Sequence, residues 1–399
     1  MTTTINNEHK KLNVPNLRFP EFQGEWEEYT LQDVVTFSNG KAHENCVNDD
    51  GDYILVNSKF VSTNGQVQKR VTSQLSPLHK SQFVMVMSDL PNGKALAKCF
   101  YVEEDNKYTL NQRVCSFTSN DGNVSRFLMY QINRNKYYLR FDDGINQTNL
   151  KKSEVLSCPV FIPIVREQEK IATLLCKIDE RIATQNKIID KLQSLIKGIM
   201  VELQKQGVNK GTWKKVFLSD VLTERNERNT NLFQVFSVSV SQGVVNQVDY
   251  LGRSFAAKDT SKYNVVHYGD LVYTKSPTGS FPYGIVKQSL NLENVAVSPL
   301  YGVYKPKSLA VGAYLHEYFM SEINTHNYLH PLIQKGAKNT INITNQRFLE
   351  NCVLLPTNIN ELLQISKLLR SLNNKIKYQQ YILQQYQKQK QYLLRQMFI

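Results

Sequence analysis

The sequence predicts an α+β fold in which two similar mixed α/β domains are separated by two long helices. The helices are expected to form an antiparallel coiled coil, and the two halves an internal repeat with pseudo-twofold symmetry. Three observations predict this fold: a coiled-coil seam that occurs twice, an upstream motif that occurs twice, and a length of 399 residues, enough for two ordinary cores. The predicted segments are a disordered lead-in at 1–14, a first domain at 15–165, a central spacer helix at 166–206, a second domain at 207–357 and a C-terminal spacer helix at 358–399.

The first spacer helix carries apolar residues in alternating steps of four and three, interrupted once by a glutamine, as in a coiled-coil seam. Its seam residues are Ile171, Leu175, Ile178, Ile182, Gln185, Ile189 and Leu192. The pattern recurs at an offset of 194 residues, interruption included, at Ile365, Leu369, Leu372, Ile376, Gln379, Leu383 and Tyr386. Ordinary core packing is the alternative for either stripe alone. Because the two stripes share their interruption, we expect the helices to pack on each other, with Gln185 hydrogen-bonded to Gln379; two unrelated, half-exposed glutamines are the alternative.

The upstream motif covers the start of each domain. GEWEEYTLQDVVTFSNGK (24–41) matches GTWKKVFLSDVLTERNER (211–228), which pairs Trp26 with Trp213. A short apolar stretch closed by proline precedes each helix, CPVFIP and CVLLP, and proline is tolerated at a helix start but not in its interior. Each half therefore consists of a mixed domain followed by one long helix.

Inside the domains the pattern changes to strands and turns. Residues 51–70 contain an Asn-Gly turn between β-prone runs. A Pro-Asn-Gly break interrupts the apolar runs of 82–102, and a Ser-Pro-Thr-Gly break occurs at a similar point of 269–287. Such breaks predict loops, where recognition residues commonly lie.

The composition limits the class of protein. A net charge of +13 and a pI of about 9.2 are typical of nucleic-acid binding, although many basic proteins bind none. The six cysteines form no CxxC pair, which argues against a zinc cage or a disulfide framework and fits a reducing cytosol. No apolar run approaches the roughly 20 residues of a membrane span, and the first residues contain no apolar signal-peptide core. We therefore expect a cytoplasmic protein with no membrane partner.

Catalytic and metal motifs are absent from the sequence. It contains no GxGxxG, Walker A, HExxH or GxSxG motif, so we expect no catalytic residue, no metal ligand and no cofactor in this chain. His326 and His330 lie four residues apart, but no carboxylate is close to them in sequence, and a structural role is favoured over a metal site. SDLPNG (88–93) lacks the second proline and the aromatic residue of the amino-methyltransferase loop. These absences favour a protein that recognises a partner over one that catalyses a reaction.

Three segments resemble a known family. PNLRFPEFQGEWEEYTLQDV (15–34), PIVREQEKIATLLCKIDERI (163–182) and QKQYLLRQMF (389–398) are similar to the start, the spacer helix and the end of the specificity subunits of bacterial type I restriction–modification systems. The second repeat departs from the pattern, since NINELLQI (358–365) replaces the Glu-Gln helix start. The resemblance covers essentially the whole chain.

The resemblance implies a non-catalytic subunit that binds double-stranded DNA through two target-recognition domains. Each domain would read one half of a bipartite, gapped site, and the helices would set the gap and dock two methyltransferase subunits. Those partners would bring S-adenosylmethionine and methylate adenine N6. Two restriction subunits would add ATP- and Mg²⁺-dependent translocation and cleavage.

The candidate DNA contacts lie in the polar loops, because Arg, Lys, Asn and Gln pair with base edges and the cations also neutralise phosphates. In the first domain they are Asn92, Lys94, Gln112, Arg113, Gln147, Asn149, Lys151 and Lys152. In the second domain they are Lys275, Ser276, Thr278, Lys335, Lys338, Asn339 and Asn342. Tyr137 and Tyr283 are candidates for packing on a sugar or base. A solvated loop residue is the alternative for each.

Two other functions compete with this interpretation. One is a coiled-coil adaptor or scaffold protein without sequence-specific DNA binding, whose basic charge serves solubility. The other is a nuclease or methyltransferase active on its own, which the missing motifs disfavour. Sequence-specific protection of DNA separates the first from a specificity subunit, and activity of the purified chain alone identifies the second.

Overall fold

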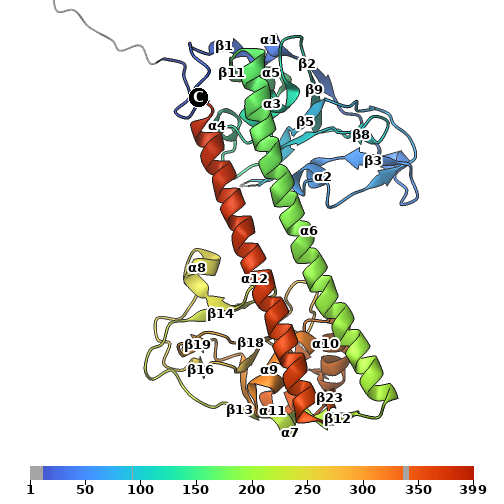
Figure 1. Ribbon diagram of the computed structural model, residues 1–399, viewed down its shortest axis with the longest axis vertical. Coiled ribbons are helices and arrows are strands. Elements are labelled where there is room, and N and C mark those ends of the chain that lie inside the picture. Colours follow the sequence, from blue (N-terminus) through green and yellow to red (C-terminus); the bar gives the residue numbers. More distant parts are fainter. Residues whose placement is uncertain (1–11, 92, 336–340) are drawn as a thin grey trace, which may run out of the picture. The chain divides into compact units, whose positions relative to one another are not determined.

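The computed structural model describes residues 12–91, 93–335 and 341–399, which form two compact units (Figure 1). The first unit comprises Met1–Thr184 with Leu383–Ile399, and the second comprises Gln185–Ile382. Each unit contains one mixed domain and part of both long helices, α6 (Val165–Asn209) and α12 (Ile359–Gln396). The spacer helices predicted at 166–206 and 358–399 thus have slightly different ends in the structure. Among the described residues, no helix is both long and apolar enough to cross a membrane.

The first unit is built on a four-stranded antiparallel sheet in the order β2 (Val35–Asn39), β9 (Val114–Ser119), β5 (Phe83–Val86) and β7 (Cys99–Tyr101). A second sheet has the order β4 (Arg70–Val71), β3 (Tyr53–Val56) and β8 (Tyr108–Leu110). Two short ladders pair β1 (Glu27–Thr30) with β11 (Pro159–Ile162), and β6 (Ser88–Asp89) with β10 (Thr148–Asn149). Its short helices are α1 (Leu31–Val34), η1 (Glu44–Cys46), α2 (Ser58–Ser62), α3 (Ser125–Ile132), α4 (Lys136–Leu139) and α5 (Lys152–Leu156).

The second unit repeats this plan with a four-stranded antiparallel sheet in the order β13 (Leu222–Glu224), β20 (Gly302–Pro306), β17 (Leu271–Tyr273) and β18 (Val286–Gln288). The ladder of β12 (Trp213–Phe217) with β23 (Cys352–Pro356) corresponds to that of β1 with β11. The remaining pairs are β14 (Phe236–Ser239) with β15 (Gly243–Asn246), β16 (Asn264–Val266) with β19 (Val295–Val297), and β21 (Gln334–Lys335) with β22 (Ile341–Asn342). Its short helices are α7 (Leu218–Val221), α8 (Gln247–Leu251), α9 (Leu309–Tyr318), α10 (Glu322–Leu329), η2 (His330–Leu332) and α11 (Asn345–Phe348).

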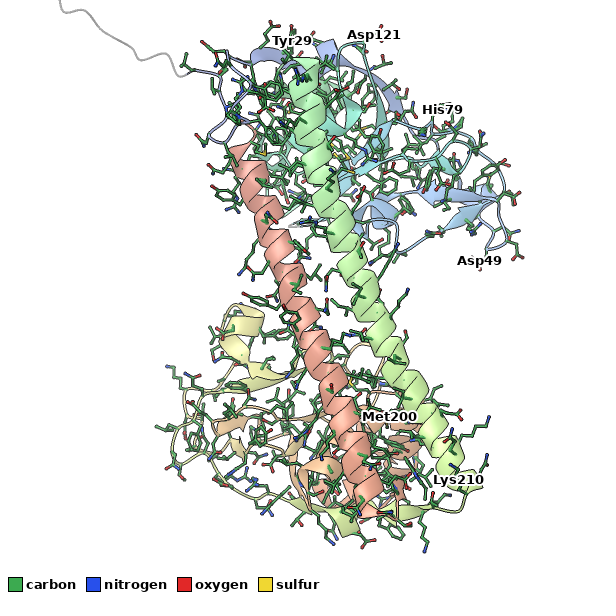
Figure 2. The ribbon with its side chains drawn as sticks, in the orientation of Figure 1. Tyr29, Asp49, His79, Asp121, Met200 and Lys210 are labelled. Atoms are coloured by element: carbon green, nitrogen blue, oxygen red, sulfur yellow. The ribbon has the colours of Figure 1, made fainter. Side chains whose placement is uncertain are left out.

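The long helices pack as an antiparallel pair. In the first unit Asp179 on α6 contacts Lys390 on α12, while Arg181, further along α6, lies over the ring of Tyr386, an earlier residue of α12. All the predicted seam residues are buried or half-buried, and Ile171, Ala172 and Leu175 join the core of the first domain together with Met397. Near the end of α6, Met200 is buried and Lys210, just past the helix, is exposed (Figure 2).

The two interrupting glutamines meet in the second unit. Nε2 of Gln185 donates to Oε1 of Gln379 and to its main-chain oxygen at 3.2 Å, and Gln185 is 6% exposed. A buried hydrogen-bonded pair of this kind fixes the register of a coiled coil at some cost in stability.

The glutamine pair yields a prediction. Replacing Gln379 with leucine leaves the Gln185 amide without its side-chain acceptor and should lower the free energy of unfolding by about 1–2 kcal/mol. The double variant Gln185→Leu with Gln379→Leu should recover this loss, because apolar partners need no hydrogen bond. Urea denaturation of the four proteins of the cycle measures both changes. A double variant less stable than the single one would contradict the prediction.

In the first turn of each long helix, a glutamate side chain accepts hydrogen bonds from a residue of the adjoining domain. Glu167 is fully buried and accepts hydrogen bonds from Arg18 at 2.8 and 2.7 Å. The neighbouring Gln168 is also fully buried and accepts from the backbone N–H of Val124 at 2.9 Å, at the start of α3. Glu361 of α12, which lies 194 residues after Glu167, instead accepts from Nε1 of Trp213 at 2.8 Å. The Glu-Gln helix start therefore makes contacts within the chain.

Candidate DNA-recognition site

The first domain brings three predicted segments together beside β6 and β10. In this ladder Ser88 pairs with Asn149 and Asp89 with Thr148. The N–H of Met87, just before β6, donates to the carbonyl of Arg113 at 2.9 Å. The N–H of Leu150 donates to the Met87 carbonyl at 2.8 Å. The backbone thus places Arg113 next to Met87, the residue that leads into β6, the partner strand of β10.

The polar side chains of this ladder form a small network. Nε2 of Gln147 donates to Oγ of Ser88 at 2.8 Å and to Oδ1 of Asn149 at 3.3 Å, and the Ser88 hydroxyl donates to the same Oδ1 at 2.6 Å. Gln147 and Asn149 are exposed, whereas Thr148 between them is buried, so strand alternation turns both amides outward. No hydrogen bond found among the described residues uses Oε1 of Gln147 or Nδ2 of Asn149. The pair thus offers one acceptor and one donor to a ligand.

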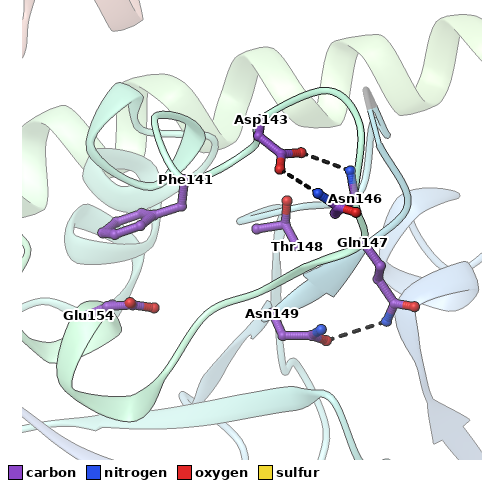
Figure 3. A pocket seen from close by; sticks show the side chains of 7 residues that line it. All are labelled: Phe141, Asp143, Asn146, Gln147, Thr148, Asn149 and Glu154. Atoms are coloured by element: carbon purple, nitrogen blue, oxygen red, sulfur yellow. Dashed lines mark hydrogen bonds between the residues drawn. The ribbon is translucent and has the colours of Figure 1, made fainter.

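An open hollow of about 200 Å³ lies beside these amides (Figure 3). Its lining residues are Phe141, Asp143, Asn146, Gln147, Thr148, Asn149 and Glu154. Its two carboxylates serve the local backbone: Asp143 accepts from the N–H groups of Ile145 and Asn146, both at 2.8 Å, and Glu154 accepts from the N–H of Lys151 at 2.7 Å. Hydrogen bonds from Asn146 and Ile145 lower the pKa of Asp143.

The loop that follows β6 is closed by Asp89. Its Oδ2 accepts from the N–H groups of Ala95 at 2.6 Å and Leu96 at 3.0 Å. A Cβ at Gly93 would lie 2.1 Å from this oxygen, so a larger residue there would displace the Asp89 carboxylate. Nη1 of Arg134 adds hydrogen bonds to the carbonyls of Gly93 at 3.4 Å and Leu96 at 3.1 Å. The exposed Lys94 is therefore carried on a braced loop, while Asn92 lies outside the described residues.

The other candidates of the first domain have different surroundings. Arg113 is exposed, and its φ of 68° lies in the left-handed region. Gln112 is exposed, but its Nε2 donates to Glu44 at 2.7 Å. Lys151 and Lys152 are exposed at the start of α5, and Nζ of Lys152 lies 5.3 Å from the Phe37 ring centre. Tyr137 packs against Tyr138, and the Arg140 guanidinium lies 4.1 Å from its ring centre.

In the second domain the residues corresponding to the Asp89 loop form a tight hairpin after β17. Thr278 pairs with Phe281, and its hydroxyl donates to the carbonyl of Ser276 at 3.0 Å. Ser276 itself is exposed. Lys275 is half-buried with φ of 60°, and burial lowers its pKa against the opposing effect of the Glu224 charge.

The last candidates lie around the β21–β22 hairpin. Asn342 is exposed on β22 and pairs with Gln334. Lys335 belongs to β21, but its side chain is not among the described parts of the structure. Lys338 and Asn339 lie outside the described residues. Tyr283 packs on His326 with ring centres 5.3 Å apart, and His326 stacks on His330 at 5.2 Å. The described residues contain no His, Cys, Asp and Glu group suited to a metal ion.

Sequence reasoning missed several residues at this surface. Lys98 donates to the Ser62 carbonyl at 2.7 Å, and burial together with the charges of Lys390 and Arg134 lowers its pKa. Lys390 is also paired with Asp179 at 2.6 Å, so its charge is partly neutralised within the chain. Asp89 could have been identified from the sequence, because Asp is common at turns and here precedes Leu-Pro-Asn-Gly. No sequence signal links Lys390 to Lys98, because the two residues are far apart in the chain.

Comparison with known proteins agrees with this architecture. Residues 23–194 match the family model described as "Type I restriction modification DNA specificity domain". The fold is similar to that of the S subunit of a type I restriction-modification system from M. genitalium, with a TM-score of 0.59 and 12% identity over 97% of this chain and 99% of that chain. The HsdS subunit from Thermoanaerobacter tengcongensis is also matched, with a TM-score of 0.35 and 14% identity over 94% of this chain and 96% of that one. Residues 23–194 are therefore similar to a type I restriction–modification DNA specificity domain, and the second unit repeats the sheet order of the first.

Proposed function

We propose that each recognition domain reads one half of a bipartite DNA site and that the paired helices fix the gap between the halves. One observation carries this proposal: the two domains share a sheet order and a framework ladder but differ in the loops that bear the candidate contacts. In the first domain β10 pairs with β6, whereas in the second β22 pairs with β21. A shared framework with different loops suits two similar domains that read different sequences.

The chain supplies recognition, and its partners supply the chemistry. Two methyltransferase subunits docked on the helices would bring S-adenosylmethionine and methylate adenine N6 at the site. Two restriction subunits with ATP and Mg²⁺ would translocate and cut unmethylated DNA. The complex acts on chromosomal and incoming DNA, so the cytoplasm is its expected location.

Mapping of N6-methyladenine tests this proposal directly. A cognate methyltransferase subunit is expressed with and without this chain, and the methylated motifs of the host genome are determined. A gapped, two-part motif that appears only with the chain is the expected result. A soluble complex that produces no such motif would contradict the proposal.

The contact types lead to a second prediction. Gln147→Ala should weaken binding at one base pair by about 1–3 kcal/mol and relax specificity there. Replacing both Lys151 and Lys152 with alanine should instead weaken binding to all sequences and lower the slope of log K against log salt by about 2. Binding isotherms at several salt concentrations, with the exposed Gln23→Ala as control, separate the two effects. An unchanged salt slope in the lysine variant would remove these residues from the phosphate contacts.

A further inference from the structure

Two large apolar side chains are exposed beside the amide pair of the first domain. Leu90 is 68% exposed and Ile145 is 80% exposed, whereas Leu96 and Leu150, close to them in sequence, are buried. Single exposed apolar residues are common on proteins and carry no meaning by themselves. Leu90 and Ile145 differ from such residues in two ways: they flank the candidate DNA-contacting amides, and hydrogen bonds fix their backbone.

Both residues flank the β6–β10 ladder. Asp89 pairs with Thr148 in the antiparallel register, so the next residues outward are Leu90 on one strand and Gln147 on the other. Ile145 lies two residues before Gln147, in the turn that leads into β10. The two apolar side chains are therefore carried by the segments that flank the amides of Gln147 and Asn149.

Hydrogen bonds fix the backbone of both residues. The N–H of Leu90 donates to Oδ1 of Asp89 at 2.9 Å, and its carbonyl accepts from the N–H of Gly93 at 2.9 Å. The N–H of Ile145 donates to Oδ1 of Asp143 at 2.8 Å. A backbone that is already fixed loses little further conformational entropy on binding. These turns hold apolar groups in water, which is unfavourable unless a partner covers them.

The chemistry of the group matches an A·T base pair in the major groove. Adenine offers a donor and an acceptor that Gln or Asn pairs with, and thymine carries the C5-methyl group that apolar side chains contact. A G·C pair has no such methyl group. The flanking Lys94, Lys151 and Lys152 are exposed cations suited to the adjacent phosphates.

We propose that Leu90 and Ile145 contact thymine methyl groups in the half-site read by the first domain, next to an adenine bound by Gln147 and Asn149. The inference rests on the proposed bipartite recognition and adds the base pair that this domain selects. The apolar pair adds methyl contacts to the discrimination that hydrogen bonds from the two amides provide.

The test uses the chain assembled with its methyltransferase subunits and a DNA library randomised in both half-sites. Wild-type selection should yield at least one A·T pair in one half-site, and Leu90→Ala and Ile145→Ala should each relax the preference there. Leu232→Ala, equally exposed but in the second unit, should leave that half-site unchanged. Replacing the selected thymines by deoxyuridine should weaken wild-type binding about fourfold per buried methyl and should have less effect in the alanine variants.

The outcomes separate this inference from the function on which it rests. A wild-type complex that selects no sequence would overturn both. A clear motif with no A·T pair in the affected half-site, or equal affinity for thymine and uracil, would overturn only the methyl contacts. Variants that lose affinity for uracil and thymine sites alike, together with kinked DNA in the wild-type complex, would indicate instead that the apolar pair inserts between base steps.

Discussion

Arg18→Ala should lower the free energy of unfolding of the first unit by about 3–5 kcal/mol, because it leaves a buried carboxylate without its counter-charge. Glu167 is fully buried, and the two hydrogen bonds described for its carboxylate both come from the Arg18 guanidinium. Arg18 also donates to the carbonyls of Gly24 at 2.5 Å and Gln23 at 3.2 Å. Its loss should therefore also release the segment that leads into β1.

The chain contains two tryptophans, one in each unit, which makes this measurement specific. In a Trp213→Phe background, the fluorescence of Trp26 reports denaturation of the first unit, where its ring packs on Phe127 and Phe398. Glu21→Ala is the matched control, since it removes a largely exposed ion pair with Lys170 and should cost at most about 1 kcal/mol. Equal losses in the two variants would show that the buried pair has no special importance.

The arrangement around Arg18 illustrates what sequence alone reveals. The seam of α6 and α12 was predictable because a heptad pattern depends only on local spacing, and its recurrence after 194 residues exposed the duplication. The ion pair of Arg18 with Glu167 was not predictable, because it joins residues 149 positions apart. The burial of Glu167 depends on how the amino-terminal segment folds over the helix start, which local spacing does not determine.

The interior of the domains was harder to predict. The β-prone run before Asn64 and Gly65 indicated a strand, and this was wrong for residues 58–62, which form α2. Asn57 caps this helix by accepting from the N–H of Phe60 at 2.9 Å, and Phe60 and Val61 are both buried. The turn itself is present, with φ of 50° and 79° at Asn64 and Gly65. Capping and tertiary burial here outweigh intrinsic strand preference.

The sequence supplied the residue types of the candidate DNA surface, and the structure supplies their arrangement. Gln147 and Asn149 were chosen as amides in a polar loop, and the structure adds that they share the Ser88 hydroxyl. The roles of Arg134 and Asp89 in bracing the loop around Lys94 follow only from backbone contacts. Leu90 and Ile145 were overlooked because apolar residues in a loop do not suggest base recognition.

The second large effect is expected at Lys287, a buried cation of the second unit. This side chain is 3% exposed, and its Nζ donates to the carbonyl of Val240 at 2.6 Å. Burial lowers its pKa from 10.5 to about 8, against the opposing effect of the Glu317 charge. Glu317 is itself buried, accepts from Nδ2 of Asn373 at 2.6 Å, and has a pKa raised by burial. The charged form of Lys287 is therefore less stable in the folded protein than in the unfolded chain.

The direction of the pH dependence follows from this lowered pKa. Between about pH 8 and 10.5 the unfolded chain keeps the Lys287 proton while the folded protein releases it, so this residue makes the free energy of unfolding rise with pH in that window. Below pH 8 both states are protonated, and the folded protein carries the full cost, which is about 3 kcal/mol for a shift of this size. Lys287→Met should remove the cost, lose about 1 kcal/mol with the Val240 hydrogen bond, and stabilise the second unit by about 2 kcal/mol at pH 7.

Urea denaturation followed by Trp213 fluorescence in a Trp26→Phe background tests this prediction at pH 7, 8, 9 and 10. The stability difference between Lys287→Met and its parent should shrink as the pH rises, because deprotonation relieves the parent of the same cost. The exposed Lys305→Met is the control and should show a small difference that stays constant with pH. A less stable Lys287→Met protein at pH 7 would mean that the attraction of the Glu317 charge outweighs the cost of burying the lysine. A difference that does not vary with pH would mean that Lys287 titrates alike in both states.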